Sequence, residues 1–228
     1  LGTDKKSESE KLDYYEKALE SMLNAVQTAE LEEYKPKENW YVLMAACYSE
    51  LSSRIGKEES LYKQLDIYEI LVNLYPKKMY FIQLGGIYGQ LNRELDYMIT
   101  LNAAYQKDLL DKESEYLALT QLLLLNNNPY WAAKVLEAGR IKKVPVIDEK
   151  TKEEKILPVV KDNEKNLKLL ADAWRMAQEI ELAIPIMEKA ARLAKDGQTF
   201  IILGSLYLSE DKLEEAVDAI CLLYTSPS

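Results

Sequence analysis

Few side chains in this sequence can perform acid–base or nucleophilic chemistry at neutral pH. The chain of 228 residues contains no histidine, the side chain that most often acts as a general base or binds a transition metal. Its two cysteines, Cys47 and Cys221, lie far apart and do not form the closely spaced pairs of a zinc site. We therefore expect no metal ion and no cofactor, and we interpret Cys47 as a small buried helix residue.

Carboxylates are the remaining candidates for catalysis, and their pattern does not favour it. Asp and Glu are interspersed with Lys along helical stretches, as is typical of a solvent-exposed face. The stretch GGIYG, which begins at Gly85, lies inside an apolar helical pattern and lacks the lysine of a phosphate-binding loop. Catalysis would require a closed pocket with convergent carboxylates near Asp172 or Glu179. The sequence therefore predicts a protein that is not an enzyme.

The charge balance restricts the class of partner. The chain has 29 Lys and Arg against 38 Asp and Glu, a formal net charge of −9. An acidic chain without a basic cluster is poorly suited to nucleic acid, because phosphate contacts dominate that affinity. No apolar run reaches the roughly 18 residues that a membrane span needs. We therefore predict no nucleic-acid partner and no membrane span.

The elements that must position any site are short helices in repeated pairs. Apolar residues recur at three- and four-residue steps along almost the whole chain. One pattern returns as FIQLGGIY from Phe81 and FIILGSLY from Phe200, with weaker copies from Trp40, Tyr116 and Leu167. In three copies a small residue follows the central leucine at the same interval, namely Ala132, Ala183 and Ala216. Matched intervals of this kind predict an array of two-helix units.

This array resembles the tetratricopeptide repeat (TPR), whose pattern is W-x2-L-G-x2-Y followed by A-x3-F and P. The resemblance implies an all-α, right-handed superhelical solenoid of helix-turn-helix repeats. The implied segments are a half-repeat at 12–34, repeats at 37–76, 78–111, 113–144 and 164–196, an insertion at 145–162 and a truncated repeat at 197–223. We expect residues 1–11 to be disordered and residues 224–228 to be a non-native tail.

Two features depart from the repeat. The stretch VPVIDEKTKEEKILPVV, from Val144 to Val160, has β-branched ends and a charged middle, and it predicts a small β-hairpin. A disordered linker is the alternative. The interval between the first two complete repeats is also too long, and the surplus lies in SSRIGKEES between the paired helices.

The glycines have a structural interpretation within this fold. The two helices of a TPR cross closely, so we expect Gly85 and Gly204 to leave room on the first helix and the small residues above to leave room on the second. Gly86 and Gly89 are expected on the inner face. They either thin the wall of a groove or are simply tolerated by a packed helix.

The first helices of stacked repeats form a concave wall, which is the predicted binding surface. The candidate residues on this wall are Tyr41, Tyr48, Ile82, Gly86, Leu117, Gln121, Leu124, Lys168, Asp172 and Arg175. The alternative is that such residues pack against neighbouring repeats. Some TPR domains hold a C-terminal carboxylate with Lys and Asn. Lys168 matches one of these positions, but Asp172 stands where Asn is needed and would repel a carboxylate.

Several stretches, among them KPKENWYVLMAACYSEL and NEKNLKLLADAWRMAQEIELAI, resemble a group of periplasmic TPR proteins of Gram-negative bacteria. Those proteins are often encoded beside TonB–ExbB–ExbD systems, so the resemblance implies a periplasmic accessory role; a cytoplasmic location is the alternative. The leading functional hypothesis is a non-catalytic scaffold that binds a protein, as a peptide or helix, in the groove. The alternative is a self-association module, a homo-oligomer in which truncated ends and inner faces pair between copies.

Overall fold

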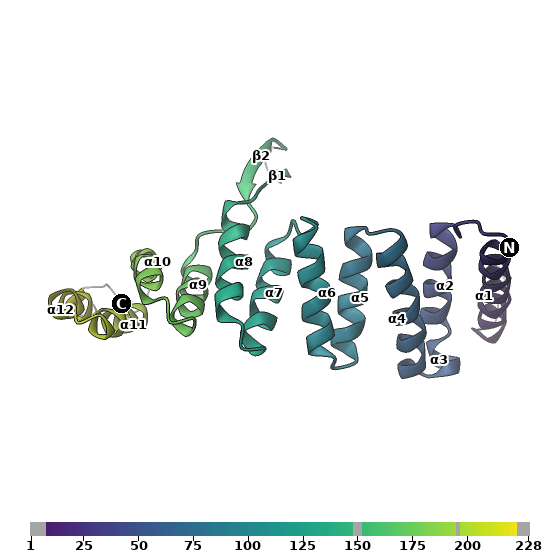
Figure 1. Ribbon diagram of the computed structural model, residues 1–228, viewed down its shortest axis with the longest axis horizontal. Helices are drawn as coiled ribbons and strands as arrows, with labels where there is room; N and C mark the ends of the chain where they lie inside the picture. Colours follow the sequence, from purple (N-terminus) through teal and green to yellow (C-terminus); the bar gives the residue numbers. More distant parts are fainter. Residues whose placement is uncertain (1–7, 148–151, 195–196, 223–228) are drawn as a thin grey trace, which may run out of the picture. The chain divides into compact units, whose positions relative to one another are not determined.

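The computed structural model describes residues 8–147, 152–194 and 197–222, which are predominantly helical (Figure 1). The predicted all-α class is confirmed, with one small sheet added. The prediction of disorder over 1–11 is wrong for residues 8–11, which form the first turn of α1. Residues 1–7 and the predicted foreign tail at 224–228 lie outside the described residues.

The chain divides into two compact units, Leu1–Leu109 and Leu110–Ser228. The helices of unit 1 are α1 (Glu8–Leu31), α2 (Glu38–Glu50), α3 (Ser52–Ile55), α4 (Lys57–Leu74), α5 (Lys78–Gln90) and α6 (Glu94–Gln106). Unit 2 contains α7 (Glu113–Leu125), α8 (Pro129–Ile141), β1 (Lys143–Ile147), β2 (Glu154–Pro158), α9 (Glu164–Met176), α10 (Ile180–Leu193), α11 (Gln198–Ser209) and α12 (Leu213–Leu222).

The turn inside each helix pair has a common backbone conformation. Between α5 and α6, α7 and α8, and α11 and α12, one residue adopts the left-handed region: Asn92, Asn127 and Asp211, with φ between 54° and 57°. Asn and Asp tolerate this region better than most side chains, because their short polar groups bond locally. Gln178 takes the same role between α9 and α10. These residues end the first helix of each pair and reverse the chain.

Small residues allow the paired helices to approach, as the sequence predicted. A Cβ placed on Gly85 would lie 2.8 Å from the Tyr97 ring of α6, and one on Gly204 would lie 2.9 Å from Cγ1 of Ile220 on α12. On the second helices, Ala132 and Ala183 are fully buried. Gly86 differs, since nothing lies within 4 Å of its added Cβ.

The surplus residues between α2 and α4 form a short structured element. They fold into the single-turn helix α3, and Gly56 follows with a φ of +95°, a conformation that favours glycine. In α1, Val26 and Ala29 are buried against α2, whereas Ala18 is exposed. Ala18 is exposed because no described helix covers that face of α1.

The predicted hairpin is confirmed. Strands β1 and β2 pair antiparallel, with Pro145 opposite Ile156, and the pair extends beyond the end of α8 (Figure 1). Its base is fixed in the core of unit 2, where Val159 and Val160 are buried. The Val160 amide donates to the carbonyl of Gly139 at 2.9 Å. A Cβ on Gly139 would lie 2.6 Å from Val160 Cγ2, so glycine is required for this close approach.

Candidate functional site

The first helices of unit 2 carry a pocket between α7 and α9. It has a volume of about 410 Å³ and brings together Leu117 and Gln121 of α7 with Lys168 and Asp172 of α9. These four residues were all predicted for the binding wall. Glu164, Lys165 and Asn166 complete its polar rim, and Leu169 adds apolar surface. The pocket therefore offers hydrogen-bonding groups and charges of both signs, from two lysines and two carboxylates.

A second pocket, of about 630 Å³, lies between α9 and α11 and shares Asp172 with the first. Its apolar lining comes from Ile180, Ile201, Ile202 and Leu206. Ser205, Ser209 and Gln178 add uncharged polar groups. We call the surface formed by these two adjoining pockets the unit 2 wall. Ile180 was not predicted for the binding wall, because the prediction took residues from first helices and Ile180 begins a second helix.

The one ion pair recorded within the unit 2 wall, among the residues that the structure describes, is loose. Arg175 contacts Asp172 at 3.3 Å, with side chains 48% and 36% exposed, so this ion pair adds little stability. A ligand can therefore reorganise both groups at small cost. Asp172 is the one carboxylate lining the α9–α11 pocket, whereas the α7–α9 pocket also has Glu164, which accepts a hydrogen bond from the Thr199 hydroxyl at 2.9 Å.

The start of α9 is fixed more firmly than its exposed face. The side chain of Asn163 caps the helix by accepting from the Asn166 amide at 2.9 Å. The side chain of Asn166, which is only 2% exposed, donates to Glu113 Oε1 at 2.6 Å and to the Lys161 carbonyl at 2.9 Å. The bond to Glu113 ties the start of α9 to the start of α7, beside the α7–α9 pocket that Asn166 lines.

The other residues predicted for the binding wall differ in how deeply they are buried. Leu124 is half-buried on α7, and in unit 1 Tyr48 and Ile82 are half-buried while Gly86 is exposed. Tyr41 is 2% exposed and belongs to a core cluster with Val26. The assignment of Tyr41 to the binding wall is therefore wrong, because its ring packs in the core and offers no surface to a ligand.

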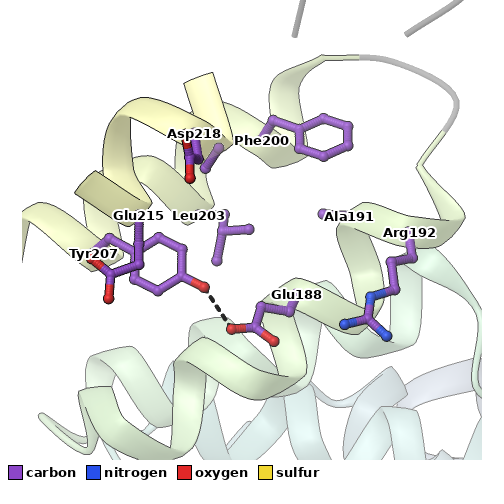
Figure 2. A pocket seen from close by; sticks show the side chains of 9 residues that line it. Glu188, Ala191, Arg192, Phe200, Leu203, Tyr207, Glu215 and Asp218 are labelled. Carbon is purple, nitrogen blue, oxygen red and sulfur yellow. Dashed lines mark hydrogen bonds between the residues drawn. The ribbon is translucent and has the colours of Figure 1, made fainter. Parts of the chain in front are cut away.

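A third pocket, of about 350 Å³, lies between α10, α11 and α12 (Figure 2). Phe200 and Leu203 give it an apolar side, and Glu215 and Asp218 of α12 add acidic groups. The hydroxyl of Tyr207 donates to Glu188 Oε1 at 2.5 Å. Burial is the main cause and this hydrogen bond the second cause of a raised pKa of Tyr207, which is about 12.

The Tyr207–Glu188 bond recurs in other repeats. Tyr88 donates to Glu69 Oε1 at 2.5 Å with the same separation of 19 residues. Where the insertion lengthens the chain, Trp174 donates through Nε1 to Glu137 Oε1 at 3.3 Å. Each bond joins a first helix to the second helix of the preceding repeat. This link was not predicted from the sequence, although in two of the three cases a glutamate 19 residues before the repeat aromatic was its signal.

The described residues contain no cluster of three or more side chains suited to hold a metal ion. None of the helices in the described ranges combines the length and the apolar character needed to cross a membrane.

Comparison with known proteins identifies the fold. No protein-family model matches the chain, and no curated protein matches it. A structure of YrrB, described as a TPR protein with an unusual peptide-binding site, is 14% identical over 84% of this chain and 87% of that chain, with a TM-score of 0.51. A structure of MamA from AMB-1 is 14% identical over 81% and 93%, also with a TM-score of 0.51. The chain therefore has the fold of a TPR-like helical solenoid.

Proposed function

We propose that the protein is a non-catalytic interaction scaffold whose unit 2 wall binds an extended peptide segment of a protein partner. One observation carries this proposal: two pockets with different chemistry adjoin at Asp172 on the first helices. Such a surface can accept successive side chains of one segment. The peptide-binding site named for YrrB, which shares the fold, supports the same use.

The lining residues suggest the composition of the peptide. The α9–α11 pocket presents Ile180, Ile201 and Ile202, so it suits an aliphatic or aromatic side chain. The α7–α9 pocket presents Lys165 and Lys168 beside Glu164 and Asp172, so it suits a polar side chain that can both donate and accept hydrogen bonds. Gln121 can bond to the peptide backbone. We therefore expect a segment that combines a large apolar residue with a nearby polar residue such as Asn or Gln.

The test is binding to an array of random dodecamer peptides, comparing the wild type with Ile201→Glu. Ile201 is 51% exposed, so the substitution places charge in the α9–α11 pocket without disturbing the core. The matched control is Val217→Glu on α12, which alters an aliphatic side chain that is 60% exposed outside the wall. We expect Ile201→Glu to abolish binding of the selected peptides and Val217→Glu to retain it. Equal binding by all three proteins would refute the proposal.

The proposed accessory role in the periplasm depends on the sequence resemblance alone. Its test is osmotic-shock fractionation of the source cells, with an antibody raised against this chain as the probe. Release with the periplasmic contents is expected. Recovery with the cytoplasmic contents would contradict it and would leave the peptide-binding proposal unaffected.

A further inference from the structure

The hairpin presents apolar side chains that nothing in the described part of unit 2 covers. Ile147 is 66% exposed and Ile156 is 71% exposed, while Val146 and Leu157 are 41% and 38% exposed. An isolated two-stranded ribbon is only marginally stable in water, and exposed apolar groups of this kind mark interaction sites. The ribbon therefore carries apolar surface that the described part of unit 2 leaves open to a partner.

The base of the hairpin is held rigidly, so the ribbon is presented in a defined orientation within unit 2. Arg140 binds both carboxylate oxygens of Asp162, at 2.5 and 2.7 Å. The Arg140 side chain is only 15% exposed, and Val160 is fully buried. A rigid base reduces the entropy that a partner would lose by ordering the ribbon.

The alternation of hydrogen-bonded and non-hydrogen-bonded residue pairs along the hairpin shows which backbone groups point outward. The Val159 amide donates to the Lys142 carbonyl at 2.9 Å, so this pair lies in a hydrogen-bonded position. The positions alternate along an antiparallel ladder. Pro145 and Ile156, which are opposite each other, therefore occupy a non-bonded position and direct their backbone groups away from the ladder.

The two outer edges are consequently different. At the middle of the β1 edge stands Pro145, which has no N–H to donate, so this edge is protected against strand pairing. At the middle of the β2 edge stands Ile156, which has both an N–H and a C=O directed outward. Among the described residues, β1 is the only strand that pairs with β2.

We propose that β2 pairs antiparallel with β2 of a second copy, across a two-fold axis at Ile156, to form a four-stranded sheet. The two Ile156 residues exchange backbone hydrogen bonds and place their side chains together on one face. Lys155 then lies opposite Leu157 of the second copy, so no like charges face each other. Because the β1 edge is blocked, assembly stops at a closed dimer.

This surface differs from the truncated ends and inner faces that the sequence suggested for self-association. It is also separate from the residues of the unit 2 wall. We choose a second copy as the occupant because, with the axis at Ile156, each charged residue of β2 faces an uncharged one: Lys155 faces Leu157 and Glu154 faces Pro158.

The experiment is sedimentation velocity of the whole chain over a wide concentration range, comparing wild type with Ile156→Pro. The Ile156 N–H is not used inside the hairpin. Pro145 and Pro158 already stand at the same kind of non-hydrogen-bonded position, so the substitution leaves the intramolecular ladder intact. We expect a wild-type dimer whose dissociation constant rises by about tenfold or more in the variant, because two symmetric hydrogen bonds are lost. A wild type that stays monomeric, or a variant that dimerises equally well, would overturn the proposal.

A second variant tests the role of the blocked edge. Pro145→Val restores an outward N–H on β1, so each copy then has two open edges. We expect assemblies larger than a dimer that grow with concentration. A Pro145→Val protein no larger than the wild-type dimer would show that proline does not limit the assembly and would contradict the proposed pairing. Ile201→Glu, which alters the unit 2 wall, should leave the dimer unchanged.

Discussion

Gly86 and Gly139 both lie inside helices, but their surroundings differ completely. Nothing lies within 4 Å of a Cβ added at Gly86. Alanine there removes the helix penalty of glycine, so we expect Gly86→Ala to raise the free energy of unfolding by up to about 1 kcal/mol. Urea denaturation measures the change. A loss of stability would mean that the exposed face of α5 is covered.

At Gly139 we expect the opposite sign. An added Cβ would lie 2.6 Å from Val160 Cγ2 and 2.7 Å from Tyr116 Cδ1, and both of those residues are buried. Overpacking of this kind costs about 1–3 kcal/mol and outweighs the gain in helix propensity. Gly139→Ala should therefore lower the free energy of unfolding in the same urea series. An unchanged midpoint would contradict the close packing of the hairpin base on α8.

The hydroxyl of Tyr207 makes the stability depend on pH in alkaline solution. Burial and the bond to Glu188 raise its pKa from the ordinary value of 10.0 to about 12. Above pH 10 the unfolded chain therefore ionises at this residue more readily than the folded chain, and stability falls as pH rises toward 12. Tyr207→Phe removes this contribution. We expect the variant to lose less stability between these values than the wild type, measured by urea denaturation at each pH; parallel curves would contradict this.

At the scale of the element, α10 contains Pro185 in its interior. Proline there cannot donate to the carbonyl of Glu181, whereas proline near the start of a helix removes no intrahelical bond. We expect Pro185→Ala to stabilise the protein by about 2 kcal/mol, after the greater freedom of the unfolded chain is subtracted. Pro129, in the first turn of α8, is the matched control, and Pro129→Ala should give no gain. Equal effects of the two substitutions would argue against a continuous α10.

The sequence predicts elements well where one local pattern determines them. Spaced apolar residues are sufficient for helices such as α9, whose buried face is Leu167, Leu170, Ala171 and Trp174. The β-branched ends and flanking prolines were sufficient for the hairpin. The same spacing rule failed at Tyr41, because it identifies a helix face but not whether a neighbouring element covers that face. Core packing around Val26 covers Tyr41, and this contact joins residues distant in sequence.

The candidate site shows the same limit. Four predicted wall residues meet in the α7–α9 pocket, since each lies on the exposed face of a regular first helix. Ile180 and Gln178 of the α9–α11 pocket were not predicted, because they follow the left-handed turn after α9. The link between repeat aromatics and glutamates was also missed. It connects two elements, so neither helix shows it alone.

At the scale of the whole molecule, contacts run mainly between consecutive helices. In unit 1, α1 packs on α2, α2 on α4, α4 on α5 and α5 on α6, and in unit 2 the same order runs from α7 to α12. Solenoids of this kind have stabilities that are approximately sums over neighbours. Effects of single substitutions should therefore remain within their repeat and the adjacent ones. The hairpin is outside this scheme, since its exposed strands contribute nothing to the stacking of helices.

Net charge provides a test of how two copies associate. Each copy carries a formal charge of −9, so two copies repel each other at low ionic strength. The proposed contact between β2 strands consists of backbone hydrogen bonds and apolar side chains, which salt does not weaken. Added salt screens the repulsion, so we expect the dimer to become tighter as ionic strength rises. Sedimentation of wild type in a salt series measures this, with Ile156→Pro as the control that should associate weakly throughout. A dimer that dissociates on adding salt would instead be held by ion pairs, and the strand-pairing proposal would be wrong.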